Sequence, residues 1–155
     1  MIEDLTGKML QEFIKTFGAS LDPRVWINFV EEETEELFEA LESGNKEHIL
    51  KEMTDLMYVQ IGFNFVSVGA EQLHLFPDME HGEIMTKLLK AGDLYSKAVD
   101  FLGRDTNFFE AFRRVHLSNM SKLDDDGFPI RREDGKILKG PNYVEPNLKD
   151  LVESK

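Results

Sequence analysis

The chain has 155 residues and a formal net charge of −12 at pH 7, from 18 basic and 30 acidic side chains. This acidic balance argues against a nucleic-acid polymer or an anionic membrane as a partner, because both bind basic protein surfaces. The chain has no cysteine, which excludes disulfides and thiolate metal sites and suits a reducing cytoplasm, the location we expect.

The length predicts one domain, residues 1–155, large enough to bury its own hydrophobic core. The longest apolar run, residues 56–70, is interrupted by polar residues and is too short to span a membrane. The N-terminal stretch MIEDLTGKML is polar and acidic, so we expect no signal peptide.

Apolar side chains recur at helical spacing along most of the chain. We expect helices over residues 3–17, 24–43, 46–68 and 83–102, and a fifth that follows a cap at Asp105 or Thr106 and reaches about Lys122. Residues 69–82 carry turn signals at Pro77-Asp78 and should form a loop between the third and fourth helices.

Capping residues mark the second and third helices. Asp22 is a suitable N-cap for the second helix, and Pro23 suits its first turn. Gly44 suits the position after its last turn, and Asn45 is a suitable N-cap for the third helix. Because so few residues connect the two helices, they should pack as an antiparallel hairpin.

After Leu123 the pattern changes. Two short extended runs flank Asp134-Gly135, a dipeptide typical of tight hairpin turns. The expected fold class is therefore all-α: an antiparallel bundle of about five helices over residues 1–122, and an irregular C-terminal tail, residues 123–155, that contains a short β-hairpin and wraps over the bundle.

The second and third helices carry an unusual set of carboxylates. Glu33 and Glu36 fall inside the apolar stripe of the second helix, and Glu52 and Asp55 border the stripe of the third. In an antiparallel hairpin the two pairs can face each other across about 8–10 Å. Carboxylates that converge in a partly dry crevice repel one another, and a hard cation such as Mg²⁺ or Mn²⁺ relieves that repulsion.

Other readings of this pattern stay open on the residues alone. A Glu-rich helix is usually a solvated face, which is what we expect for Glu31, Glu35, Glu39, Glu42 and Glu47. For the four inward carboxylates, a metal site and an ordinary acidic surface are about equally favoured by the periodicity. Calcium and zinc fit less well, because the chain has no D-x-D-x-D-G loop and its four histidines are scattered.

Two motifs lie on this hairpin. Residues 32–36 read E-E-x-x-E and residues 52–55 read E-x-x-D, with fifteen residues between them. With residues 115–122 and the hairpin that follows, this pattern resembles the all-α nucleoside triphosphate pyrophosphatase superfamily, which includes MazG-like enzymes, dimeric dUTPases and phosphoribosyl-ATP pyrophosphohydrolases. The acidic run is longer than the motif, so Glu31 and Glu35 are alternatives to Glu32 and Glu36; the apolar stripe favours Glu33 and Glu36.

The resemblance implies metal-dependent hydrolysis of a nucleoside triphosphate to the monophosphate and pyrophosphate. It assigns Glu33, Glu36, Glu52 and Asp55 to Mg²⁺, for which Mn²⁺ can substitute. Glu32 would orient or deprotonate the attacking water, with Glu33 as the alternative for that role. The resemblance also implies a homo-oligomer, a homodimer or a homotetramer.

Substrate contacts are expected beyond the metal. Asn119 and Lys122 lie on the inward face of the fifth helix, and Lys139 lies in the basic part of the tail with Arg131, Arg132 and Lys136. Trp26, at the start of the second helix, could stack on a base. A capping asparagine, surface lysines and a core tryptophan are the structural alternatives for these residues.

The function most consistent with the sequence is hydrolysis of deoxynucleoside triphosphates in nucleotide-pool control. One alternative enzyme is phosphoribosyl-ATP pyrophosphohydrolase of histidine synthesis. A further alternative is a non-catalytic acidic helical protein that binds a partner protein.

Overall fold

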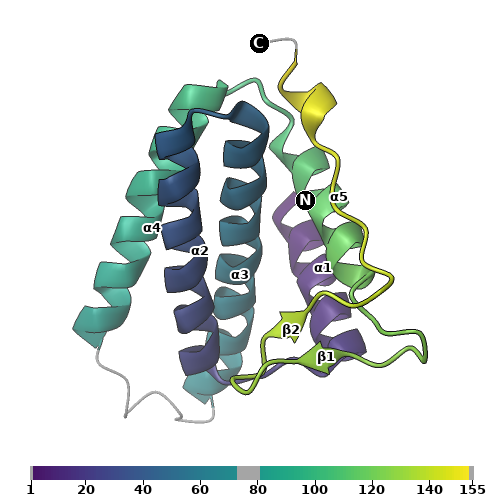
Figure 1. Ribbon diagram of the computed structural model, residues 1–155. Helices are drawn as coiled ribbons and strands as arrows, with labels where there is room; N and C mark the ends of the chain where they lie inside the picture. The colour runs from purple at the N-terminus through teal and green to yellow at the C-terminus, as the bar shows by residue number, and fades with distance from the viewer. Residues whose placement is uncertain (1, 73–80, 154–155) are drawn as a thin grey trace.

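The computed structural model describes residues 2–72 and 81–153. Within them the fold is an all-α bundle with one small antiparallel hairpin, as the sequence predicts (Figure 1). The helices are α1 (Ile2–Phe17), α2 (Pro23–Ser43), α3 (Lys46–Gln72), α4 (His81–Leu102) and α5 (Phe108–Met120). The strands are β1 (Ile130–Arg131) and β2 (Ile137–Leu138), and a short 3₁₀ helix, η1 (Lys149–Leu151), follows in the tail.

Helices α2 and α3 form the predicted antiparallel hairpin, and its caps are the predicted ones. The Asp22 carboxylate accepts a hydrogen bond from the Arg24 amide at 2.9 Å. Gly44 ends α2 with φ of +68°, a left-handed conformation that glycine adopts at little cost. The Asn45 side chain then accepts from the His48 amide at 3.0 Å and starts α3. Local chemistry thus fixes how the two acidic helices face each other.

Two predicted boundaries were wrong. The cap of α5 is Asn107, whose side chain accepts from the Glu110 amide at 3.1 Å, and neither Asp105 nor Thr106. Thr106 instead belongs to the turn after α4, where its amide donates to Gly103 O at 3.1 Å. The loop expected over residues 69–82 is also shorter, because α3 continues to Gln72 and α4 begins at His81. The turn predicted at Pro77-Asp78 lies outside the described residues.

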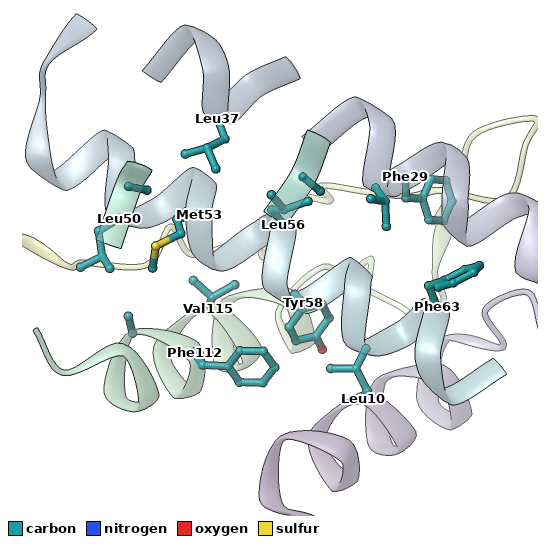
Figure 2. Close-up of a cluster of buried hydrophobic side chains, with 14 of the residues drawn as sticks. Leu10, Phe29, Leu37, Leu50, Met53, Leu56, Tyr58, Phe63, Phe112 and Val115 are labelled. Carbon is teal, nitrogen blue, oxygen red and sulfur yellow. The ribbon is translucent and has the colours of Figure 1, made fainter. Parts of the chain in front are cut away.

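Helix α3 is the centre of the bundle and packs against the four other helices. Figure 2 shows Phe29 and Leu37 of α2 on one side of it and Phe112 and Val115 of α5 on the other. A helix covered on several sides needs apolar residues around most of its circumference. Any carboxylate on α3 that faces a neighbouring helix is therefore buried. No helix in the described part of the chain is long and apolar enough to cross a membrane.

The C-terminal tail runs back along α5 and holds the hairpin against the lower end of α1 (Figure 1). Strands β1 and β2 pair Ile130 with Leu138 and Arg131 with Ile137, around the predicted turn. The Arg131 guanidinium donates to Phe17 O at 2.6 Å and to Gly18 O at 2.8 Å, so it caps the C-terminus of α1. These contacts place the basic residues of the hairpin opposite α2.

Candidate functional site

Three carboxylates from the α2–α3 hairpin converge. One carboxylate oxygen from each of Glu33, Glu36 and Glu52 lies within 4.8 Å of the other two. Glu33 and Glu52 are buried, with only 7% and 6% of their surface exposed, whereas Glu36 faces solvent. Helical spacing aligns the two α2 residues, and the short connection brings Glu52 opposite them.

The proximity of these groups changes their protonation. Burial, together with the negative charge of Asp55, raises the pKa of Glu33 to about 8, against the opposing effect of Lys136. Burial also raises the pKa of the Glu52 carboxyl. Without a cation, the cluster therefore keeps a proton on Glu33 at neutral pH.

The cluster fits a divalent cation. Glu52 Oε2 is buried and has no hydrogen-bond partner within the described residues, which leaves a strong acceptor unsatisfied. Its other oxygen, Oε1, lies 3.1 Å from Lys51 Nζ and 3.3 Å from His48 Nε2. His48 contacts Glu52 but is not among the converging groups, which are three carboxylates, the ligand chemistry of Mg²⁺ and Mn²⁺. Glu33, Glu36 and Glu52 could thus hold such an ion.

Asp55, the fourth expected ligand, lies beside this cluster. Like Glu33 and Glu36, it lines a pocket between the helices and the β-hairpin. Its Oδ2 is bound by Lys51 Nζ at 2.9 Å. The pKa of Lys51 is raised: burial lowers it, but the charges of Asp55 and Glu52 outweigh burial. Lys51 is therefore a fixed positive charge inside the acidic site.

Glu32 stands apart from the cluster. Its carboxylate is bound by Arg132 at 3.1 Å and by Lys136 at 2.9 Å, both from the hairpin. The hydrogen bond from Arg132 is the main cause of a lowered pKa for Glu32. Glu32 thus holds the hairpin over α2, while Glu33, its neighbour in the chain, faces the acidic cluster.

A pocket of about 440 Å³ lies between the α2–α3 hairpin, α5 and the β-hairpin. Its lining includes three carboxylates, Glu33, Glu36 and Asp55, and four lysines, Lys51, Lys122, Lys136 and Lys139. The remaining wall is mainly apolar, with Asn119 among its residues: Phe13, Ala19, Trp26, Phe29, Tyr58 and Val59 from the helices and their connections, and Gly135, Ile137, Leu138 and Tyr143 from the hairpin and the tail. Acidic, basic and apolar surfaces therefore meet in one cavity.

All four residues predicted to contact substrate line this pocket, in different environments. The Lys122 ammonium has no hydrogen bond or ion pair with the described residues, and burial lowers its pKa. Lys139 is exposed, and its Nζ lies 4.8 Å from the ring centre of Tyr143. Asn119 is buried at the pocket wall.

Trp26 belongs to the core as well as to the pocket. Its indole N–H donates to Ser20 O at 2.6 Å, and only 2% of its surface is exposed. The ring lies on Gly62 of α3, where a Cβ would meet Trp26 Cζ3 at 2.2 Å. A glycine is thus required for this close approach, and the ring is fixed in place.

Sequence reasoning missed Lys51 and Tyr58 as parts of this region, and it missed the contact of His116, which it took as a structural residue or as a polar group behind the site. Lys51 and Tyr58 carried a usable signal, because they lie four residues before and three residues after Asp55 on the same helix. His116 carried none, because its contact with Tyr58 joins two helices far apart in the chain.

Comparison with known proteins supports the resemblance seen in the sequence. Residues 10–67 match the family model described as phosphoribosyl-ATP pyrophosphohydrolase, a member of the all-α, MazG-like NTP pyrophosphatase superfamily. The matched segment contains both acidic motifs and ends before α4. Neither the curated proteins nor the solved structures gave a match.

Proposed function

We propose that this pocket is the active site of a metal-dependent nucleotide pyrophosphohydrolase, because residues 10–67, which contain both acidic motifs, match the phosphoribosyl-ATP pyrophosphohydrolase family model. The observation that carries the proposal is the acidic cluster itself. Three carboxylates converge, one buried oxygen among them has no partner in the described chain, and lysines line the same cavity.

The reaction joins water to the α-phosphorus of the nucleotide and breaks the bond from that phosphorus to the bridging oxygen, so that pyrophosphate leaves. A bound Mg²⁺ would supply charge neutralisation and a more acidic water. Glu33, Glu36 and Glu52 would hold it, with Asp55 as a further ligand. Lys122 and Lys136 would bind phosphate oxygens, and Lys139 would add charge at the exposed edge.

Two glutamates are candidates for activating the water. Glu32 is bound by two hairpin cations, and its lowered pKa makes it a poor proton acceptor. Glu33 faces the cluster, and a bound cation would displace its proton, so its carboxylate could keep one oxygen on the ion and turn the other toward the attacking water. We therefore propose that Glu33 is the general base. Glu32 would instead hold Lys136 in position.

A deoxynucleoside triphosphate is the proposed substrate, with a role in nucleotide-pool control. Phosphoribosyl-ATP is the second candidate, because the matching family model carries that description. Both substrates have a polyphosphate for the metal and the lysines, and both have a base for the apolar wall.

Exposed apolar side chains on α2 and α4, among them Phe38, Leu89 and Phe101, support a homodimer or homotetramer, which light scattering would measure.

The test is pyrophosphate release from the eight common ribo- and deoxynucleoside triphosphates and from phosphoribosyl-ATP, each with Mg²⁺ or Mn²⁺. Hydrolysis of one or more triphosphates, lost in Glu36→Gln and kept in Glu39→Gln, is the expected result. Glu39 is the matched control because it lies on the exposed face of α2. Release from phosphoribosyl-ATP alone would establish the second candidate. If no nucleotide released pyrophosphate, and Glu36→Gln bound metal as wild type does, the proposal that the protein is an enzyme would be refuted.

A further inference from the structure

The two oxygens of Glu52 lie in different environments. Oε2 is buried and has no hydrogen-bond partner within the described residues. Oε1 accepts a hydrogen bond from the Lys51 ammonium at 3.1 Å. A carboxylate that bridges two metal ions also gives one oxygen to each of them. Glu52 is therefore arranged like a bridging ligand, with an ammonium at one of its two oxygens.

Lys51 contacts a second carboxylate as well. Its Nζ donates to Asp55 Oδ2 at 2.9 Å, so the ammonium lies between Asp55 and Glu52. These two acidic residues are the E-x-x-D motif, and both are expected metal ligands. The ammonium thus binds two carboxylate oxygens that a metal ion at the same place would use.

Packing keeps the ammonium at this place. Lys51 and Asp55 are one turn apart on α3 and share a face of the helix. Only 28% of the Lys51 side chain and 21% of the Asp55 side chain are exposed, and Glu52 is more deeply buried than either. Water and salt screen such a pair less than a pair at the surface. A metal ion could reach Glu52 Oε1 and Asp55 Oδ2 only by displacing the ammonium.

The place suited to a divalent ion is a different one. It is formed by one oxygen from each of Glu33, Glu36 and Glu52, which lie within 4.8 Å of one another. In the part of the chain that the structure describes, Asp55 does not belong to this group. Hydrolytic sites with two metals hold their ions about 3.5–4 Å apart. Here Glu52 joins the two places, and Lys51 occupies the second.

We propose that Lys51 takes the place of a second metal ion. The site then binds one divalent cation, at Glu33, Glu36 and Glu52, and uses the ammonium as its other positive charge. The hydrogen bonds to Glu52 and Asp55 use two of the three ammonium donors. The third serves a phosphate oxygen in the pocket that Lys51 lines. This inference rests on the proposed metal-dependent function and adds the number of ions.

An ammonium and a divalent ion supply different chemistry. Both stabilise negative charge on phosphate oxygens, but only the metal ion makes a bound water markedly more acidic. Activation of the water therefore depends on the single ion and on Glu33. Lys51 contributes positive charge and a hydrogen-bond donor.

The experiment counts bound Mn²⁺ in the absence of nucleotide. Isothermal titration calorimetry and electron paramagnetic resonance are recorded on the full chain with Mn²⁺ alone. Wild type should bind one tight ion per chain, with the signal of an isolated Mn²⁺. Lys51→Met keeps a long side chain without the charge, and should bind two ions with the magnetically coupled signal of a close pair. Ions held weakly by the acidic surface give no coupled signal.

Three further variants make the count decisive. Lys51→Arg keeps a cation that can bind both carboxylates, and should bind one ion as wild type does. Lys46→Met, at the first residue of α3 and outside the pocket lining, removes a lysine charge elsewhere and should also bind one. Lys51→Gln replaces Lys51→Met if the latter does not fold, which thermal unfolding in EDTA shows.

The outcomes separate this inference from the proposed enzyme. A coupled pair of ions in wild type, or no tight ion, would overturn the inference whether or not the variants fold. A single ion in folded Lys51→Met or Lys51→Gln would also overturn it. One ion in wild type and two in the variant, without pyrophosphate release from any nucleotide, would refute the enzyme and support the inference. Pyrophosphate release by a wild type that holds a coupled pair would do the reverse.

Discussion

Lys51 and Asp55, one turn apart on α3, form an ion pair of 2.9 Å at the edge of the acidic cluster, and Lys51 also contacts Glu52 Oε1 at 3.1 Å. The protein thus places one of its own cations among the carboxylates. That ammonium offsets part of the repulsion that drives divalent-ion binding, and it lies against ligand atoms that an ion would use. Its removal should have opposite effects on metal affinity and on folding.

The first prediction concerns Lys51→Met, which keeps a long apolar side chain without the charge. We expect Mn²⁺ to bind about tenfold more tightly, because the cluster becomes more negative and Glu52 Oε1 keeps only His48 Nε2, at 3.3 Å, as a partner. The metal-free protein should lose about 3 kcal/mol of stability, because a largely buried ion pair is broken on one side. Calorimetric titration with Mn²⁺ and thermal unfolding in EDTA measure the two effects.

Lys46→Met, at the first residue of α3 and outside the pocket lining, is the control for loss of a lysine from the same helix. It should leave Mn²⁺ affinity unchanged. Weaker Mn²⁺ binding in Lys51→Met would contradict the competition between lysine and metal, and would instead give Lys51 a role in orienting Glu52.

The second prediction is a fall in metal-free stability between about pH 4.5 and pH 8. The folded protein holds a proton on Glu33 up to about pH 8, whereas an unfolded chain releases it near pH 4.5. Within this window the folded state binds more protons, so its stability is greatest at the acidic end and decreases by up to about 1.4 kcal/mol per pH unit. Thermal unfolding in EDTA across this range measures the slope.

Glu33→Gln removes the titrating group and should flatten that slope, leaving the variant more stable than wild type at pH 8 without metal. Saturating Mg²⁺ should also flatten it, because the ion replaces the proton. Glu39→Gln, on the exposed face of the same helix, should keep the wild-type slope. An identical slope in Glu33→Gln and wild type would show that other groups cause the pH dependence.

The third prediction separates Glu32 from Glu33. In Glu33→Gln we expect kcat to fall at least about 100-fold, as for loss of a general base or metal ligand. In Glu32→Gln the main effect should be a severalfold increase in KM, because Lys136 loses its 2.9 Å partner and is less well placed for phosphate. Steady-state pyrophosphate release measures both. Equal losses of kcat in the two variants would contradict this division and would show that Glu32 takes part in the reaction itself.

Local periodicity predicted the all-α fold and placed Glu33, Glu36 and Glu52 where they could meet, although Glu36 is exposed and does not lie within the apolar stripe. The helical repeat determines which face a residue occupies, and the Gly44-Asn45 connection leaves α2 and α3 one way to pack. The cap at Asn107 was not predicted, because three adjacent residues are suitable caps. Only the turn after α4 decides between them.

The separation of Glu32 from Glu33 could not be predicted in the same way. It depends on Arg132, which pairs with Glu32, and on Lys136, which lies 2.9 Å from Glu32 and 3.4 Å from Glu33, and therefore on where the tail carries the hairpin. The anchor for that hairpin, Arg131 on the last carbonyls of α1, is likewise a contact between distant segments. Periodicity specifies faces within a helix but not the path of an irregular tail.

The last prediction tests the packing of the pocket wall. In Gly62→Ala the new methyl group would meet the Trp26 ring at 2.2 Å, and that ring is fixed by the hydrogen bond to Ser20 and by edge contact with Phe29 at 5.7 Å. We expect a loss of about 1–3 kcal/mol of stability from overpacking, with a larger KM because the apolar wall shifts.

Gly92→Ala on α4 is the matched control, because it is also a glycine inside a helix and its Cβ would meet nothing within 4 Å. That substitution should stabilise the protein by up to about 1 kcal/mol through the higher helix propensity of alanine. Urea unfolding of both variants gives the two changes in free energy. If Gly62→Ala were as stable as Gly92→Ala, with unchanged KM, the Trp26 ring would have to be free to move, and its place as a fixed wall of the pocket would be wrong.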